Sequence, residues 1–322
     1  LYFTGSKNFN VRLRQLAHSR NSKVNEYGVF RVEADREVCL ASRTEKECFQ
    51  ALGLPDIPPE LREDIGGEAL FSGRPLPRLV RREDIRGDLH VHSRYSDGRA
   101  SIREMAEAAQ AMGYQYLAVC DHSARLKVAG GLSVDDLKRK KDEIDRLNRR
   151  MTGFRILFGS EVEIDSEGGL DYNEDILSRM DVVVAAVHSR FDLGREQMTR
   201  RLVRAVQNPA VHILAHPTGV HIGKREPYDL DFKELCRAAV DSHVALEINA
   251  FPVRLDLDSS HIYYARSLGV RFCVNTDAHA PDHLGLMRYG ISLARRGWLE
   301  KAHILNTLPL EQLLKVLKKP CD

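Results

Sequence analysis

The chain has 322 residues, of which 43% are hydrophobic and 29% are charged, an ordinary composition for a soluble globular protein. This length suits one large domain and a small one, because a single hydrophobic core stops growing near roughly 250 to 300 residues. No apolar run approaches the ~18 residues of a membrane span, which excludes an integral membrane protein and a membrane partner. The formal net charge is only +2, so the whole-chain charge does not indicate a polyanionic partner.

The cysteines and the first residues bear on the compartment. No paired spacing that would suggest a disulfide framework is found among Cys39, Cys48, Cys120, Cys236, Cys273 and Cys321. We therefore expect a reducing, cytoplasmic environment. The chain starts at Leu1 without a basic-then-apolar leader, and we expect a fragment or a processed product of a longer protein.

Residues 1–57 are predicted to form a small mixed α/β module. Apolar spacing favours a helix over residues 10–18, a short strand over 27–32 and a second helix over 45–52, which Gly53 ends. The first 23 residues contain no acid but five basic side chains, at Lys7, Arg12, Arg14, Arg20 and Lys23. Such runs are more often solvated faces than nucleic-acid sites, so both interpretations stay open.

Residues 58–85 have the composition of a linker. Prolines, glycines and charges interrupt any periodic pattern, and at most one brief helix is expected. A second basic cluster lies here, at Arg74, Arg78, Arg81 and Arg82.

From residue 86 onward, short apolar runs alternate with helical patterns, which is typical of a parallel sheet with crossover helices. We predict seven strands, over residues 87–91, 116–120, 155–161, 181–187, 211–215, 244–248 and 270–275. One connecting helix illustrates the pattern. Ser101 is expected to cap it, Glu104 completes a capping box, and Gly113 ends it just before the next strand. A helix over 260–268, followed by Gly269, precedes the last strand in the same way.

Side chains that could bind a metal or polarise a phosphate follow nearly every predicted strand. In a closed parallel barrel the carboxyl ends of the strands meet on one face, so these side chains should gather in one pocket. The candidate metal ligands are His90, His92, Asp97, His122, Glu161, His188, His216, Asp277 and His279.

The types of these ligands indicate the metals. His90 and His92 are two residues apart in a strand, so both lie on the same face and can bind one ion. Imidazoles and carboxylates without thiolates suit zinc, manganese or iron. Nine ligands are too many for one ion. A carboxylate such as Glu161 can bridge two, which leaves enough groups for two or three ions with open positions for water and substrate oxygens.

A simpler interpretation exists for each residue alone. A lone histidine at a strand end is more often a hydrogen-bonded structural residue, and Asp97 with Gly98 alone would be an ordinary turn. The whole set favours the metal site, because six of the thirteen histidines fall at the ends of predicted strands.

The motifs at 88–92 (DLHVH), 121–122 (DH), 159–161 (GSE), 188–190 (HSR), 216–217 (HP) and 277–279 (DAH) resemble those of the polymerase and histidinol phosphatase (PHP) family. The resemblance covers the chain from about residue 86 to the end and implies a distorted seven-stranded, TIM-like βα barrel. It also implies phosphoester hydrolysis with three divalent ions, Mn2+, Zn2+ or Fe2+. The family pattern assigns one ion to His90, His92, Glu161 and Asp277, a second to Glu161, His188 and His216, and a third to Asp97, His122 and His279.

The implied mechanism is attack on phosphorus by a water that two ions acidify, while the third ion neutralises phosphate oxygens. Two further residues are candidates for catalysis. Arg190 could clamp a phosphate or could equally pair with Asp192 at the surface. Asn249 could orient an oxygen.

The first module resembles the junction of palm and thumb in family X DNA polymerases. The residues that carry this resemblance are the YFTGSK segment at 2–7, Asn10, Arg14 and the NEYG segment at 25–28. In that family the matching segment lies beneath the sugar of the incoming nucleotide, which implies DNA or nucleotide contacts at Tyr2, Phe3, Gly5, Asn10 and Arg14. A turn with a basic amphipathic helix is the simpler alternative. The palm carboxylates would precede Leu1, so this chain alone is not expected to polymerise DNA.

We therefore expect the C-terminal part of a family X DNA repair polymerase, with a thumb-like module, a linker and a PHP barrel. The expected reaction is metal-dependent phosphodiester hydrolysis on single-stranded or gapped DNA 3′ ends, as a 3′ to 5′ exonuclease with possible 3′-end processing. A free-standing phosphatase of small metabolites such as histidinol phosphate is the alternative. A DNA-binding or scaffold module with structural metals is a third possibility, although structural sites close their coordination with protein ligands.

Overall fold

The computed structural model describes residues 1–33, 36–63 and 65–318. These residues divide into two compact units, one of residues 1–79 with 295–298 and the other of the remaining described residues. No helix within the described ranges has the length and apolar character needed to cross a membrane. Cys321 lies outside the described residues.

The first unit is a small sheet with helices. It contains α1 (Lys7–Ser19), β1 (Ser22–Asn25), β2 (Gly28–Glu33), β3 (Arg36–Ala41), α2 (Glu45–Ala51) and α3 (Gly67–Phe71). The three strands form an antiparallel sheet in the order β1-β2-β3. The predicted helices and the predicted strand are present, and α1 starts three residues early because the Ser6 hydroxyl caps it. β1 and β3 were not predicted, since the mostly exposed β3 has no apolar alternation.

The core of this unit includes part of the predicted linker. α1 buries Phe9, Leu13 and Ala17, which lie four residues apart on one helical face. Leu61 and Leu70, from the segment predicted as linker, are also fully buried in this unit. The boundaries at residues 57 and 85 stay a prediction.

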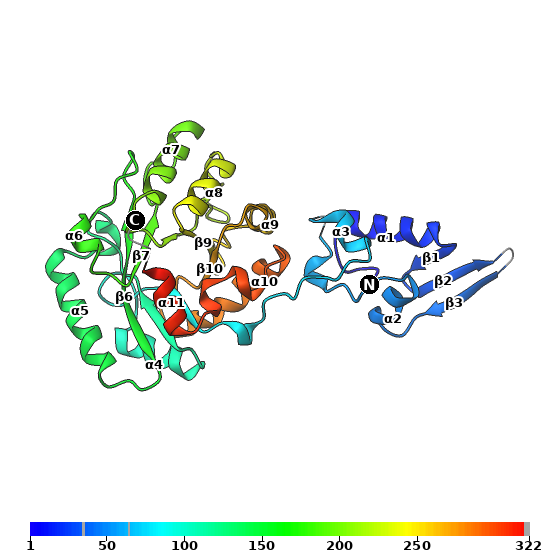
Figure 1. Ribbon diagram of the computed structural model, residues 1–322, viewed down its shortest axis with the longest axis horizontal. Coiled ribbons are helices and arrows are strands. Elements are labelled where there is room, and N and C mark those ends of the chain that lie inside the picture. Colours follow the sequence, from blue (N-terminus) through cyan, green and yellow to red (C-terminus); the bar gives the residue numbers. More distant parts are fainter. Residues whose placement is uncertain (34–35, 64, 319–322) are drawn as a thin grey trace. The chain divides into compact units, whose positions relative to one another are not determined.

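The second unit is a parallel barrel of seven strands (Figure 1). Its strands are β4 (Gly87–Val91), β5 (Tyr116–Val119), β6 (Arg155–Glu163), β7 (Val182–Ala186), β8 (Ile213–Leu214), β9 (Ala245–Asn249) and β10 (Phe272–Asn275). They lie side by side in chain order and every neighbouring pair is parallel. All seven predicted strands are therefore confirmed, as is the predicted α/β class.

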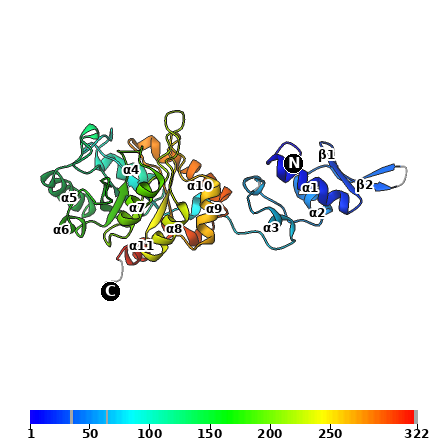
Figure 2. The ribbon, with the colours of Figure 1, turned by 90° about the horizontal axis from the view of Figure 1, so that it is seen from above.

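Helices connect the strands and surround them (Figure 2). After β4 the α-helices are α4 (Ile102–Ala111), α5 (Val134–Asn148), α6 (Glu174–Leu177), α7 (Arg195–Val206), α8 (Phe232–Asp241), α9 (Ser259–Ser267), α10 (Met287–Arg296) and α11 (Leu310–Leu317). The predicted capping box of α4 is confirmed, because the Ser101 hydroxyl accepts from the Glu104 amide and the Glu104 carboxylate accepts from the Ser101 amide. Gly113 follows α4 with a φ of 84°, which favours glycine.

Hydrogen bonds between the end of β4 and the segment that follows β10 close the barrel at its carboxyl end. The Asp277 amide donates to the His90 carbonyl at 3.0 Å, and the His92 amide donates to the Ala278 carbonyl at 2.8 Å. Further down the seam, the buried Asn306 side chain donates to the carbonyls of Gly87, in β4, and Val274, in β10. The closure brings the ligands that follow β10 beside those that follow β4.

The inner face of the barrel changes from apolar to polar along the strands. At the amino end, inward side chains such as Leu157, Ala245 and Cys273 form a buried cluster that α11 covers with Leu313 and Leu317. Every second residue of a strand points the same way. The inward positions further along β6, β9 and the end of β10 are accordingly Glu161, Glu247, Asn249, Asn275 and Asp277, all buried.

Candidate metal centre

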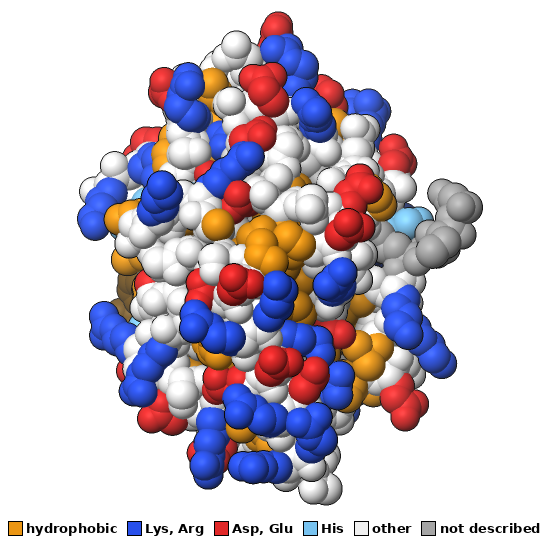
Figure 3. All heavy atoms as spheres, turned by 90° about the vertical axis from the view of Figure 1, so that its left-hand side faces the viewer, with side chains coloured by type: hydrophobic (Ala, Val, Ile, Leu, Met, Phe, Trp, Pro, Cys, Tyr) orange, Lys and Arg blue, Asp and Glu red, His pale blue; other side chains and the backbone are white. Residues whose placement is uncertain are grey.

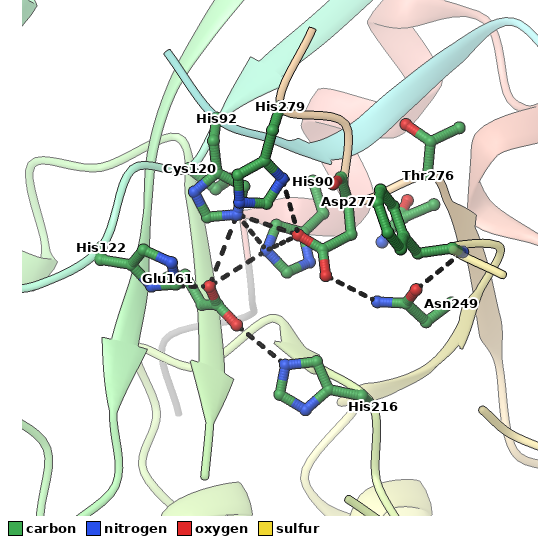
Figure 4. Close-up of polar contacts among 12 residues, drawn as sticks. His90, His92, Cys120, His122, Glu161, His216, Asn249, Thr276, Asp277 and His279 are labelled. Atoms are coloured by element: carbon green, nitrogen blue, oxygen red, sulfur yellow. Dashed lines mark hydrogen bonds and ion pairs between the residues drawn. The ribbon is translucent and has the colours of Figure 1, made fainter. Parts of the chain in front are cut away.

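The nine predicted ligands meet at the carboxyl end of the barrel. Figure 4 shows His90, His92 and His122 turned toward Glu161, with Asp277 and His279 beside them. Six of the nine are buried, while His188 and His279 are partly exposed and Asp97 is the most exposed. The ligands come from the end of β4 and the turn after it, from β6, and from the segments after β5, β7, β8 and β10.

Glu161 lies at the centre of this cluster. One carboxylate oxygen is 3.0 Å from His216 Nε2 and 3.3 Å from His188 Nε2. The other is 2.9 Å from His122 Nδ1, and it also lies 3.4 Å from His90 Nε2 and 3.5 Å from His92 Nε2. Both oxygens thus have imidazole nitrogens close by, which is the arrangement a carboxylate that bridges two ions requires.

The structure contains three groups of possible ligands, and within each group the ligand atoms all lie within 4.8 Å of one another. They are His92, Asp97, His122 and His279; His90, His92 and Asp277; and His122, Glu161 and His188. The first group contains the third predicted set together with His92. The second group contains His90, His92 and Asp277 of the first predicted set. In the remaining group His122 takes the place predicted for His216, although His216 lies 3.0 Å from Glu161. Metal binding by the nine residues stays a prediction.

Hydrogen bonds at Nδ1 orient three of the imidazoles. His90 Nδ1 lies 2.8 Å from Glu247, His188 Nδ1 lies 2.8 Å from Glu163, and His279 Nδ1 lies 2.7 Å from the Asp277 carbonyl. Each of these acceptors favours a proton on Nδ1, so we infer a lone pair on Nε2 that faces the cluster.

The Nε2 lone pairs face other acceptor atoms, and this arrangement bears on whether cations fit the site. His90 Nε2 is 3.2 Å from His92 Nε2, and His279 Nε2 is 3.3 Å from an Asp97 oxygen. Acceptors that converge in a buried place repel one another unless protons or cations lie between them. The donor set of imidazoles and carboxylates suits divalent transition metals, so the residues fit the predicted ions.

The imidazoles of the cluster differ widely in pKa. Burial lowers the pKa of His92 to about 4, and His122 acts in the same direction. Burial also acts to lower the pKa of His122. The nearby carboxylates, Glu161 foremost, outweigh burial and raise this pKa to about 10. Burial followed by the charge of Arg254 lowers the pKa of His216 to about 4. Metal ions would therefore compete with protons for some of these imidazoles.

The backbone is strained at two ligands. His216 has a φ of 30° and Asp277 a φ of 53°, in the left-handed region that residues other than glycine rarely adopt. Such strain persists where the surroundings hold it, and it is common at functional sites.

The comparisons with known proteins agree with this geometry. The PHP domain model matches residues 88–250, about half of the chain, and the DNA polymerase beta thumb model matches residues 1–63. The chain belongs to the PHP family. Both resemblances seen in the sequence are thereby confirmed, and so is the predicted enzyme class, a metal-dependent phosphoesterase, at the level of the family.

Two relatives illustrate the range of proteins that contain this PHP domain. DNA polymerase/3′-5′ exonuclease PolX of Bacillus subtilis is 44% identical over 318 residues, which are 99% of this chain and 55% of the relative. The chain thus spans little more than half of that relative. A probable phosphatase of Thermoanaerobacter sp. is 30% identical over 68% of this chain and 89% of its own length.

One similar solved structure is histidinol phosphate phosphatase from Lactococcus lactis, in complex with zinc, L-histidinol and phosphate. It is 21% identical and covers 65% of this chain and 93% of its own, with a TM-score of 0.49.

The two predicted catalytic residues of the PHP domain have different surroundings. Asn249 is fully buried, and its amide nitrogen donates to Glu247 at 3.1 Å and to Asp277 at 3.2 Å, so it helps to orient a predicted ligand. The Arg190 side chain is 59% exposed and pairs with Asp192 at 3.3 Å. The structure thus brings Asn249 into the cluster but places Arg190 in the surface pair that was its alternative.

Three residues of the site were not predicted. Glu163 and Glu247 orient imidazoles, and Arg254 Nε lies 3.7 Å from an Asp277 oxygen with only 16% of its side chain exposed. A signal existed for Glu247, because it is a carboxylate two residues before Asn249 in a strand whose other three residues are apolar. Arg254 lies in the loop after β9, where the sequence carries no comparable pattern.

The predicted DNA contacts of the thumb unit lie around α1. Phe3 is 88% exposed and packs edge-on against Tyr2, which is partly exposed. Gly5 has a φ of 103°, and a Cβ there would be 2.7 Å from that of Arg62. Asn10 donates to the Ser6 carbonyl and accepts, through its own carbonyl, from the exposed Arg14. Their role in DNA binding stays a prediction.

Proposed function

We propose that this chain hydrolyses phosphodiester bonds at DNA 3′ ends, as a 3′ to 5′ exonuclease within a protein of the PolX type. The observation that carries this proposal is the convergence of nine imidazoles and carboxylates in one cluster, with Glu161 at its centre, in a chain whose first 63 residues match a polymerase thumb. A relative named as a polymerase and exonuclease over 99% of this chain supports it. The chemistry would take place where DNA is found, in the cytoplasm.

Three divalent ions, Mn2+, Zn2+ or Fe2+, are proposed as cofactors. His90, His92, Glu161 and Asp277 would hold one, Glu161, His188 and His216 a second, and Asp97, His122 and His279 a third. Such ions acidify a water molecule and neutralise charge on the phosphate.

The chain's own residues would position the reactants. Glu247 and Glu163 hold the rings of His90 and His188 in place. Arg254, beside Asp277, could donate hydrogen bonds to a non-bridging phosphate oxygen. In the reaction, a water oxygen bonds to phosphorus and the bond from phosphorus to the neighbouring O3′ breaks. The water proton ends on that O3′, and a 5′-mononucleotide leaves the shortened strand.

Phosphatase activity on small metabolites is the second candidate. A probable phosphatase matches over 68% of this chain and 89% of its own length, which favours this alternative. It gives no role to the thumb-like unit.

One experiment separates the two functions. The full chain would be loaded with Mn2+ or Zn2+, and its bound metals measured. It would then be incubated with 5′-labelled single-stranded or gapped DNA, and separately with histidinol phosphate. We expect a ladder of products shortened from the 3′ end, lost in His90→Ala and retained in His261→Ala, which changes a partly exposed histidine paired with Asp258. Release of phosphate from histidinol phosphate with intact DNA would overturn the proposal.

A further inference from the structure

A buried ion pair lies beside the metal centre. Lys140, in α5, and Asp121, which directly precedes the predicted ligand His122, are both fully buried, and their Nζ and Oδ2 atoms are 2.8 Å apart. Lysine and aspartate are almost never fully buried unless they are paired. Because the burial of two charges is costly, such a pair is weak evidence for stability, and its place next to a predicted ligand indicates a role in the site.

Charged pairs at the surface of the protein differ from this one. On the face shown in Figure 3, basic side chains are interspersed with acidic ones. Lys141, the next residue of α5, pairs with Asp145 at 2.6 Å, and both of these side chains are more than a third exposed. Exposed pairs of this kind contribute little to stability. Lys141 therefore provides a control for Lys140 on the same helix.

The Asp121 carboxylate holds the turn that carries two other predicted ligands. Its Oδ1 atom accepts from the Ser93 amide at 2.7 Å and from the Ser96 hydroxyl at 2.9 Å. Its Oδ2 atom accepts from the Ser93 hydroxyl at 2.9 Å. Ser93 follows His92 and Ser96 precedes Asp97, so the carboxylate fixes both ends of the segment between these two ligands.

Lys140 also contacts β6. Its Nζ atom donates to the carbonyl of Gly159 at 3.0 Å, two residues before Glu161. The Ser160 hydroxyl of the same strand donates to the Asp121 carbonyl at 2.9 Å. Lys140 thus connects α5 both to the segment after β5 and to the strand that carries the central carboxylate of the cluster.

The charge of Lys140 balances that of Asp121. Burial acts to raise the pKa of Asp121, but the favourable contacts, Lys140 foremost, outweigh burial and lower this pKa to about 2. Ser93 and Ser96 donate hydrogen bonds to the carboxylate but carry no charge. Loss of Lys140 would leave a buried carboxylate without its counter-charge, which is strongly unfavourable. The carboxylate would then move from its place and release the turn that it holds.

We propose that the Lys140–Asp121 pair positions the ligands of the third ion, in particular Asp97 and His122. The inference rests on the proposed function, because the ions are part of that proposal. Neither Lys140 nor Asp121 is among the nine ligands, so both are positioning residues. Asp97 is the most exposed of the nine and lies in a turn, and it therefore depends most on support from outside the cluster.

The other two predicted ligand sets have supports of their own. Glu247 orients the ring of His90, and Glu163 orients that of His188. Glu161, which both sets share, lies in β6 and is held there by pairing with β7. Loss of the buried pair should therefore affect the third ion before the other two.

Metal content tests this proposal without turnover. The full chain would be loaded with Mn2+, dialysed against increasing concentrations of a chelator and analysed for bound metal, as wild type, Lys140→Met and Lys141→Met. We expect three ions in the wild type and in Lys141→Met. In Lys140→Met one ion should bind roughly 10-fold or more weakly, with the other two unchanged. Three ions of wild-type affinity in Lys140→Met would overturn the proposal, as would fewer than three ions in the wild type.

A second variant keeps the test decisive if Lys140→Met does not fold. Ser93→Ala removes the hydroxyl bond to Asp121 but keeps the amide bond and the ion pair. It should weaken the third ion several-fold, and an unchanged affinity would overturn the proposal. In the double variant with Lys140→Met the effect should not exceed that of Lys140→Met alone, because both changes act through one turn. Additive effects, or a lower Tm with wild-type metal affinity, would assign the pair to stability alone.

Failure of the exonuclease proposal would give a different result. If Lys140→Met loses the third ion but the wild-type chain releases no nucleotides from DNA, the proposed function fails and the positioning role stands. If the wild type is active and Lys140→Met keeps three tightly bound ions, the positioning role fails and the function stands. Raised Mn2+ should restore nuclease activity to Lys140→Met, and activity that stays low with three ions bound would contradict a role in positioning metal ligands.

Discussion

His90 Nδ1 lies 2.8 Å from Glu247 Oε1, and both side chains are fully buried. The second oxygen of Glu247 accepts from the His216 amide at 2.9 Å and from the Asn249 side chain at 3.1 Å. One carboxylate therefore orients a ligand on β4 and the backbone of a ligand after β8. The Nε2 atom of His90 is left to face Glu161 and Asp277.

Glu247→Gln should weaken metal binding without unfolding the barrel. The amide keeps the size of the side chain but loses the negative charge that raises the basicity of His90. Changes of this kind typically cost roughly 10 to 100-fold in metal affinity. Competition with a chelator, followed by metal analysis, measures the change. Glu107→Gln, in an exposed pair on α4, is the control and should leave affinity unchanged. Equal affinities for both variants would show that Glu247 does not tune the site.

Arg254→Ala should lower turnover while metal content stays near that of the wild type. The side chain lies beside Asp277, and its buried Nη1 atom has no hydrogen-bond partner among the described residues, so it is available to a substrate oxygen. Loss of one such charged donor should reduce kcat on DNA by roughly 100-fold. Arg288→Ala, which removes an exposed arginine stacked on Tyr289, serves as the control. A large loss of bound metal in Arg254→Ala would instead assign Arg254 a role in holding Asp277.

The sequence carries enough information to predict the barrel and the convergence of the candidate ligands, because both depend on local patterns. Apolar runs of the right length mark the strands, and a ligand at the end of each strand needs only the rule that parallel strands converge. The partners of those ligands are harder to predict. Glu163 lies on the same strand as Glu161, but its partner His188 lies in the segment after β7, and only the register between β6 and β7 brings them together.

Arg62 shows the limit more clearly. The prolines, glycines and charges around it predict a linker, yet Arg62 and Arg201 are the two largest fully buried side chains among the described residues. Arg62 can be buried because the carboxylate of Glu45, in α2, accepts hydrogen bonds from both of its terminal nitrogens. The backbone carbonyl of Ile57 accepts a third hydrogen bond, from Nε. A charged side chain is stable in the core only when it is paired and hydrogen-bonded. Here the partners are distant in the sequence, and no periodic pattern indicates them. Likewise, nothing in the spacing of Asn306 indicates that it fills the seam between β4 and β10.

Asn306→Ala should destabilise the barrel. The Asn306 side chain donates to Gly87 and Val274 and accepts from the Val274 amide, all in buried surroundings. Its removal leaves buried backbone groups without partners, at a cost of roughly 2 to 3 kcal/mol. Urea unfolding followed by circular dichroism measures the change. Gln312→Ala, an exposed substitution in α11, should have little effect, and similar midpoints for the two variants would contradict the role of Asn306.

Glu45→Gln should destabilise the first unit at neutral pH but much less in acid. The hydrogen bonds from Arg62 lower the pKa of Glu45 from 4.5 to about 2. Because the folded pKa is depressed, this stabilisation is fully present above pH 4.5 and is lost as the pH falls toward 2. The difference in Tm between wild type and Glu45→Gln, measured by calorimetry, should therefore shrink over that interval. Glu37→Gln, which breaks an exposed pair with Lys23, should change Tm little at either pH. A Tm difference for Glu45→Gln that stays constant down to pH 2 would mean that the carboxylate charge does not hold Arg62, and that packing of Arg62 over Phe49 is the stabilising contact instead.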